Sequence, residues 1–453
     1  MGVVVESEVW EPQPFFYLLL FFFSSSSILL FPYFSSSART KHHASSSSID
    51  FGSSATFPRF QRSFLVLYSL ASLISGLGSV FGDSEYQHYG ASREQIVMCL
   101  AAGVAVSLLV GTFLGMISDI TGPRKACMVF CILHLIVGFL KSVTKHPSVL
   151  LTSICLSLAS SLMSFSFETW MVSEHEKGYR KDLLTDTFWL MTFSESSSLI
   201  GSQVLANFMV KDTNKGFFTP STPAALLALL SIIYISKEWT GYKHSFSIHK
   251  YRESFYDQVL GDKKVWILAL AQGFLHFSIY MFWILWAPTT VADGREVQLS
   301  LLYPCFLGSK MLGSTAIPWF FSGASPFRND DSLTAAFVIA GLCLSVVAYD
   351  YQDVGVLLLL FCIFCACTGF IIPSLARLRT LYVPNEMRGG MISLSLAPSH
   401  IAILFFLLQG GYYRNISNST IMAMAAIGLF SAAGCIHALK RWKKQTPENW
   451  HKL

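Results

Sequence analysis

The chain has 453 residues, of which 53% are apolar and only 13% are charged. Soluble domains carry about 25% charged residues, so this composition excludes an ordinary soluble protein and indicates one that lies in a lipid bilayer. The net charge of +5 is small. It reflects an unequal distribution of basic residues between the loops rather than a nucleic-acid-binding surface, so we expect no nucleic-acid partner.

Residues 15–34 form the first apolar stretch, and about 20 apolar residues are enough to cross a bilayer. Acidic residues precede it, where a signal peptide would carry basic ones. Arg39 and Lys41 follow it, which places the N-terminus outside and residue 40 inside. We therefore expect residues 1–34 to hold an extra anchor helix, favoured over a cleaved signal peptide. A flexible Ser-rich linker is expected at residues 35–61.

Twelve more apolar segments follow the linker. The longest polar gap between them, residues 237–263, separates two sets of six that cover residues 62–236 and 264–438. We expect the gap to be a cytoplasmic central loop and residues 439–453 to be a cytoplasmic tail. The predicted segments lie near residues 62–82, 94–117, 126–144, 148–171, 187–209, 221–236, 264–287, 299–320, 333–349, 354–376, 389–409 and 417–438.

The basic residues are distributed unequally between the predicted sides. If the first of the twelve segments starts in the cytoplasm, 24 of the 32 Lys and Arg residues lie inside and seven outside, with Lys310 inside a segment. This bias supports the placement. Two glycosylation sequons, at Asn415 and Asn418, fall in the last outside loop, where oligosaccharide could be added.

The turn between the second and third segments reads G-x-x-x-D-x-x-G-x-R-K, with its defined positions at Gly115, Asp119, Gly122, Arg124 and Lys125. It resembles the signature loop of major facilitator superfamily transporters. The resemblance implies an all-α membrane protein with the major facilitator fold, two six-helix bundles, here with an extra N-terminal transmembrane helix. It also implies a cytoplasmic loop that helps to latch the two halves together.

Glu168 lies near the cytoplasmic end of the fourth segment. We expect it to pair with Arg124 or Lys125 and to form with Asp119 a cytoplasmic gate. The nearby acidic and histidine residues at 174–176 cannot converge on one ion from a helix, so no metal site is expected there. The chain has no nucleophile elbow, phosphate loop or HExxH motif, and we expect neither an enzyme nor a cofactor.

Two charged residues fall deep inside predicted segments, where charges are costly and often functional. Glu195, among four serines, lies about 13 Å into the fifth segment, and Lys310 is at similar depth in the eighth. Low dielectric favours the protonated form of Glu195, which could carry a proton; a structural hydrogen bond to a neighbouring helix is the alternative. Lys310 could pair with Glu195 or bind an anionic substrate.

The seventh segment carries a polar face. Gln272, His276, Tyr280 and Trp283 are spaced four, four and three residues apart, so they share one side of a helix. Such a face points to a bundle interior or a water-filled cavity. Its donors could hold substrate oxygens, or it could serve helix packing through hydrogen bonds and aromatic contacts.

A closer resemblance is carried by four stretches of the chain. They are FPRFQRSF (57–64), FSFETWMVSEHE (165–176), FWILWAP (282–288) and IIPSLARLRTLYVPNEMRGGM (371–391). With these stretches the chain is similar, over nearly its whole length, to the molybdate-anion transporter family, a eukaryotic branch of the facilitator superfamily, and its last 18 residues resemble the plant members. The resemblance implies molybdate uptake by a secondary active transporter, in the plasma membrane or an endomembrane. We expect a monomer, with protons as a candidate co-substrate.

Two alternatives remain. One is a facilitator for an organic solute such as a sugar or amino acid, for which Tyr280, Trp283 and Trp286 would suit stacking. The other is a membrane receptor or scaffold that no longer transports, against which the charges at mid-depth argue. The fourth segment lacks the arginine of many proton-coupled facilitators and the fifth lacks the Gly-Pro of antiporters, so the sequence establishes neither coupling mode.

Overall fold

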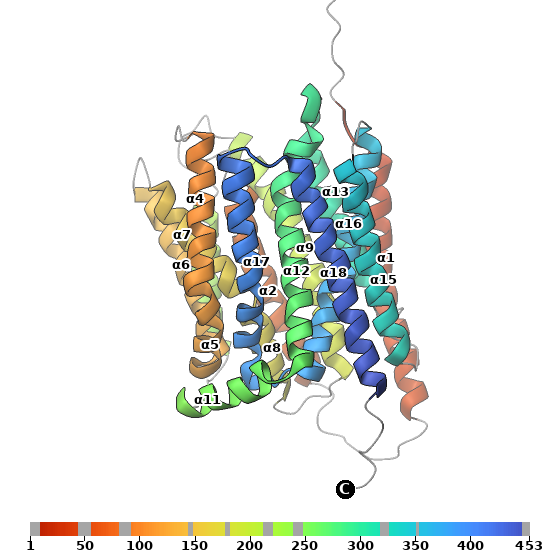
Figure 1. Cartoon of the computed structure of the whole chain (residues 1–453). Helices are drawn as coiled ribbons and strands as arrows, with labels where there is room; N and C mark the ends of the chain where they lie inside the picture. The colour runs from red at the N-terminus through yellow and green to blue at the C-terminus, as the bar shows by residue number, and fades with distance from the viewer. Residues whose placement is uncertain are drawn as a thin grey trace, which may run out of the picture.

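The chain folds into a bundle of α-helices that run side by side along a common axis (Figure 1). The computed structural model describes residues 10–43, 56–80, 92–143, 148–176, 182–211, 221–238, 248–317, 326–349 and 353–445. Within these residues, extended structure is limited to one bridge between Trp10 and Val297.

The N-terminal half packs α2 against α9 and α10, α6 against α7 and α10, and α4 against α7. Small residues allow the close approach: a Cβ on Gly103 would overlap the hydroxyl of Ser157 on α7. The helices are α2 (Thr56–Val80), α4 (Arg93–Val106) continued by the π-helical η1 (Ser107–Gly111) and α5 (Thr112–Thr121), α6 (Pro123–Val143), α7 (Val149–Met163), α8 (Ser166–Glu176), α9 (Asp182–Lys211) and α10 (Ser221–Glu238).

The C-terminal half is built in the same way, with α12 against α17 and α18, α15 against α18, and α13 against α16. A Cβ on Gly313 or on Gly369 would overlap the backbone of the facing helix, so α13 and α16 are in backbone contact. The helices are α12 (Lys263–Thr290), α13 (Leu299–Thr315), α15 (Pro326–Tyr349), α16 (Val354–Tyr382), α17 (Arg388–Phe406) continued by the π-helical η6 (Leu407–Tyr412), and α18 (Asn418–Gln445).

Each of the twelve predicted segments overlaps a helix or a run of joined helices. Among the described residues, nine helices are long and apolar enough to cross a bilayer. Neither α9 nor α13 is one of the nine, and these two helices pack against each other across the halves. The faces of α9 and α13 that meet are covered by protein rather than by lipid, so these faces can carry polar residues.

The two ends of the bundle are distinct. The end that holds the Asp119–Lys125 turn, called the motif end below, also carries the short helix α11 (Ile248–Phe255), which lies across the bundle axis (Figure 1). The segment between α12 and α13 and the start of α18 lie at the opposite end. The helix α11 lies within residues 237–263, the predicted central loop.

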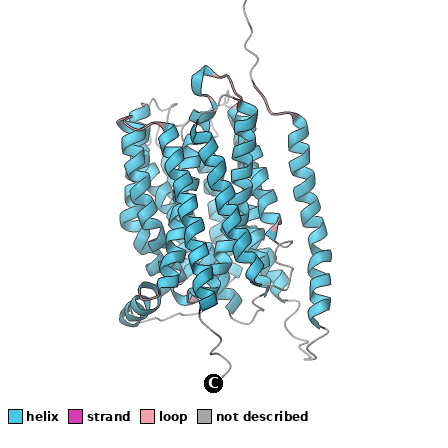
Figure 2. Ribbon diagram, turned by 45° about the vertical axis from the view of Figure 1, so that its right-hand side comes forward, coloured by secondary structure: helices cyan, strands magenta, loops and turns pink. Residues whose placement is uncertain are grey.

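An additional helix, α1 (Pro14–His43), stands at the side of the bundle (Figure 2) and packs against α13. The Trp10 amide donates to the carbonyl of Glu296 at 2.9 Å, and the Tyr17 hydroxyl donates to the Leu301 carbonyl at 2.7 Å. The predicted linker is shorter than expected because α1 continues through residues 35–43 and α2 already begins at residue 56. Serine has only a mild preference against helix, so a Ser-rich tract can extend one.

Candidate functional site

The two halves touch along the whole bundle axis, through α5 and α17, α9 and α13, α9 and α16, and α4 and η6. Polar contacts between the halves form successive layers from the motif end to the opposite end.

The layer nearest the motif end is centred on Asp119. Its carboxylate oxygens accept the backbone N–H groups of Gly389 at 3.0 Å and Gly390 at 2.7 Å, at the start of α17. The first N–H groups of a helix have no partner within it and carry partial positive charge, so an acidic side chain stabilises them. Asp119 of the N-terminal half therefore caps a helix of the C-terminal half.

Glycines make this contact possible. A Cβ on Gly115 would overlap the carbonyl of Gly389, and a Cβ on Gly389 would lie 2.6 Å from Asp119 Oδ1. Gly122 has a φ of 102°, a conformation that glycine adopts readily, and ends α5. The close approach of α5 to α17 thus explains the glycine at Gly115, and the turn explains the glycine at Gly122.

Tyr251 of α11 adds a third donor. Its hydroxyl donates to Asp119 Oδ2 at 2.9 Å, and its ring stacks on Phe255. Burial, together with the nearby Asp119 carboxylate, raises the pKa of Tyr251 far above physiological pH, so the hydroxyl remains a donor. The helix of the central loop is therefore attached to the contact between α5 and α17.

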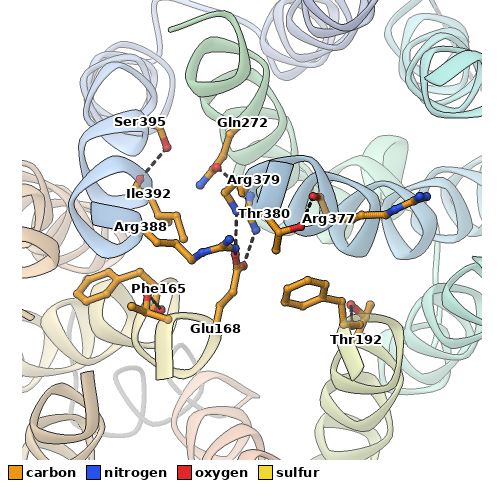
Figure 3. A network of polar contacts seen from close by, with 12 residues as sticks. Phe165, Glu168, Thr192, Gln272, Arg377, Arg379, Thr380, Arg388, Ile392 and Ser395 are labelled. Atoms are coloured by element: carbon orange, nitrogen blue, oxygen red, sulfur yellow. Dashed lines mark hydrogen bonds and ion pairs between the residues drawn. The ribbon is translucent and has the colours of Figure 1, made fainter. Parts of the chain in front are cut away.

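The next layer holds Glu168, in the first turn of α8 (Figure 3). Its carboxylate accepts two hydrogen bonds from Arg379 of α16, at 2.9 Å from Nε and at 2.5 Å from Nη2. It accepts a third from Nη1 of Arg388 on α17, at 3.0 Å. Arg379 also donates to Gln272 Oε1 of α12 at 2.9 Å. The side chains are almost fully buried: 13% of Glu168, 7% of Arg379 and none of Arg388 is exposed.

The predicted pairing of Glu168 with Arg124 or Lys125 is wrong. Arg124 Nη2 donates to the carbonyl of Ile235 at 2.8 Å, near the end of α10 in the same half, and Lys125 is exposed. Carbonyls at a helix C-terminus attract cations, which explains where Arg124 points. The predicted segments at 354–376 and 389–409 leave Arg379 and Arg388 in the loop between them. Glu168 itself signals that basic partners are needed, because a buried acid requires them, but it does not say which ones.

The third layer lies midway along the bundle. Lys310 Nζ of α13 is 3.1 Å from Glu195 Oε2 of α9, and 13% and 29% of the two side chains are exposed. Tyr68 and Tyr303 lie close enough to Glu195 for electrostatic interaction. The structure thus brings the two predicted mid-depth charges together, one from each half.

The polar face of α12 connects the second layer to the third. At one end Gln272 contacts Arg379, and at the other the Trp283 ring lies 5.5 Å from that of Tyr303. Between them the ring of His276 lies 6.2 Å from Tyr280 and 5.3 Å from His400 of α17. Sequence reasoning missed His400, which no periodic pattern singled out.

Toward the opposite end, the described part of the chain joins the halves through a neutral hydrogen bond. The Gln203 side-chain amide of α9 donates to the Ser300 carbonyl of α13 at 2.7 Å. Pro304 has no N–H to bond this carbonyl four residues earlier, so the proline leaves Ser300 available to the other half. Asn415 and Asn418 are exposed at the same end, and Asn415 donates to Gln409.

A family model described as sugar transporters with 12 transmembrane segments matches residues 28–357. The chain belongs to this family, within the major facilitator superfamily. Relatives named molybdate-anion transporter are similar to it: one from Xenopus tropicalis is 24% identical over 84% of this chain and 86% of its own length. One from Takifugu rubripes is 23% identical over 78% and 79%. These findings confirm the family resemblance seen in the sequence.

Two solved structures share the fold. The proton:xylose symporter XylE bound to 6-bromo-6-deoxy-D-glucose has a TM-score of 0.62 at 12% identity and covers 85% of this chain and 96% of its own. The human organic anion transporter MFSD10 has a TM-score of 0.60 at 11% identity, covering 84% and 99%. The chain is therefore an integral multi-pass membrane transporter with the major facilitator fold, and family and fold are those of transporters rather than enzymes.

Proposed function

We propose that this chain is a secondary active transporter that carries molybdate, or a closely related oxyanion, across a membrane by alternating access. The observation that carries the proposal is the Lys310–Glu195 pair, a cation held at mid-depth between the two halves of a chain whose relatives are named molybdate-anion transporter. A monomer is sufficient, because both halves of the site come from one chain.

The chemistry of a tetrahedral dianion favours such a site. Molybdate must lose much of its water in a narrow passage, which is costly unless fixed donors or positive charge replace it. Lys310 supplies a charge, and Gln272, His276, Tyr280 and Trp283 supply neutral donors from α12. The short distance from Glu195 to Lys310 means that an anion must compete with this carboxylate.

Competition with Glu195 provides a route to proton coupling. An ionised Glu195 holds Lys310 and repels a dianion, whereas a protonated Glu195 releases Lys310. Lower pH on the uptake side should therefore favour substrate binding. We propose Glu195 as the proton-coupling residue.

Alternating access requires the halves to separate at one end at a time. We propose that the Asp119 and Glu168 layers form the gate of the motif end and that this end faces the cytoplasm, as the distribution of basic residues favours. The membrane is then the plasma membrane or an endomembrane with the same orientation.

Uptake into vesicles tests the function. Purified protein in liposomes should accumulate labelled molybdate, with competition by sulfate but not by glucose. Liposomes with the Lys310→Ala protein serve as the matched control. Molybdate accumulation equal to that of empty liposomes would refute the proposal.

A sugar is the second candidate. The family model is described by sugar transport, and Trp283 packs against Tyr303 beside the charged pair, which offers a ring on which a sugar could stack. The same vesicles decide between the two candidates, because uptake of glucose or xylose that molybdate does not inhibit would support sugar transport.

A further inference from the structure

The Glu168 layer has more positive than negative charge. One carboxylate lies between two guanidinium groups, and all three side chains are buried. Asp119, another acid that interacts electrostatically with Arg388, is engaged by the N-terminus of α17 and by Tyr251. Arg388 Nε is buried without a hydrogen-bond partner among the described residues. Such an orphan donor in a native structure calls for an explanation.

Opening of the motif end would make the imbalance larger. Glu168 belongs to the N-terminal half, whereas Arg379 and Arg388 belong to the C-terminal half. When the halves part, the carboxylate leaves and the two guanidinium groups remain together without a counter-charge. The lost attraction to Glu168 and the repulsion between the two guanidinium groups both oppose opening, and an anion that takes the place of Glu168 would offset this cost.

We propose that Arg379 and Arg388 form a second oxyanion site, in which a divalent oxyanion replaces Glu168 as the motif end opens. This inference rests on the proposed oxyanion transport. A tetrahedral dianion neutralises both guanidinium groups, whereas the single carboxylate neutralises one. Guanidinium groups bind oxyanions through paired N–H donors, and the orphan Arg388 Nε and the amide nitrogen of Gln272 add further donors on the same side (Figure 3).

The site also provides selectivity. Coulomb attraction scales with ligand charge, so the two arginines favour a dianion over a monoanion and over a neutral sugar. The dianion would pass from Lys310 at mid-depth to the arginine pair nearer the motif end. The polar face of α12 extends between the two positions, from Trp283 to Gln272.

Direct binding to purified protein tests the competition. Glu168→Gln removes the competing charge, so the Kd of molybdate should fall about tenfold and that of nitrate about threefold, because the gain scales with charge. Arg379→Gln should raise the molybdate Kd about tenfold. Glu168→Gln with Arg379→Gln restores the net charge and should return the Kd to near the original value.

Three further variants complete the design. Arg377→Gln is the matched control, since Arg377 lies two residues from Arg379 on α16 and its side chain points away from Glu168 (Figure 3); its molybdate Kd should not change. Lys310→Ala combined with Glu168→Gln should still bind molybdate, because the arginine pair remains. If Glu168→Gln does not fold, Glu168→Asp shortens the acidic side chain and weakens its contact with the arginines, so it should lower the molybdate Kd less, but in the same direction.

The outcomes separate the two proposals. If the unaltered protein neither binds nor transports molybdate or sulfate, the proposed function is wrong. If it binds molybdate but the Glu168 and Arg379 variants keep its Kd within about twofold, the second site is wrong and the transport function stands. Equal gains for molybdate and nitrate in Glu168→Gln would also overturn the site, since they would show general opening rather than a charge-selective pair.

Discussion

The two ends of the bundle hold the halves together by different means. At the motif end, buried ion pairs join Glu168 to Arg379 and Arg388, and Asp119 caps α17. At the opposite end, a neutral hydrogen bond between Gln203 and Ser300 joins the halves in the described part of the chain. A neutral hydrogen bond contributes about 0.5–1.5 kcal/mol, whereas breaking a buried ion pair costs about 3–5 kcal/mol. On these contacts the opposite end should open more readily, so the proposed cytoplasmic placement of the motif end would favour an outward-facing resting state.

The largest expected effect comes from Glu168→Leu. It leaves two buried guanidinium groups without a counter-charge, and we expect a loss of about 3–5 kcal/mol from the closed state of the motif end. Thermal unfolding and labelling of a cysteine placed near Gln272 from the motif side should both report the change. Glu253→Leu, on the exposed face of α11 in the central loop, serves as control. Equal unfolding temperatures for both variants would contradict the assigned strength of this layer.

Lys310→Ala should lower molybdate uptake by about 10- to 100-fold, because a charge-assisted hydrogen bond contributes about 1.5–3 kcal/mol. Lys310→Arg keeps the charge and should lose far less. Glu195→Gln should flatten the pH dependence, since uptake then no longer requires that carboxyl group to be protonated. Uptake measured across a pH series checks all three variants. Wild-type uptake by Lys310→Ala would remove Lys310 from the site.

Asp119→Asn removes the charge that caps α17 and should weaken the motif-end contact by about 0.3–2 kcal/mol. Tyr251→Phe removes one donor to the same carboxylate, with an expected loss of about 1 kcal/mol. Cysteine labelling from the motif side should increase in both variants, more in Asp119→Asn. The outcome that would count against a role for α11 is labelling of Tyr251→Phe at the original rate.

The smallest effect is expected at the opposite end. Gln203→Leu removes the bond to Ser300 and should favour opening there by about 0.5–1.5 kcal/mol. Pro304→Ala restores an N–H that competes for the Ser300 carbonyl, so it should act in the same direction but more weakly. Labelling from this side should rise in both variants, while labelling from the motif side should not. A larger effect here than in Glu168→Leu would reverse the proposed comparison of the ends.

Some of this arrangement is predictable from sequence. Long apolar segments located the helices, and opposite charges at mid-depth pointed to the Glu195–Lys310 pair, because lipid tolerates such charges chiefly when they are paired. The partners of Glu168 were not predictable, because Arg379 lies 211 residues away in sequence and near the end of its helix, where it is indistinguishable from a loop arginine. Gln203 and Ser300 are common polar residues. Only the packing of α9 on α13 makes their contact specific.

The attachment of α1 has a consequence for which parts of the chain move together. α1 comes first in the sequence but is fastened to the C-terminal half, through Trp10 to residue 296 and Tyr17 to Leu301. Gly308 of α13 leaves room for Leu20, which completes the attachment. In a rocking motion of the two halves, α1 would therefore travel with the second half. The chain would then cross between the two halves twice, once between α1 and α2 and once in the central loop, and a helix that precedes the N-terminal half in sequence would move with the C-terminal half.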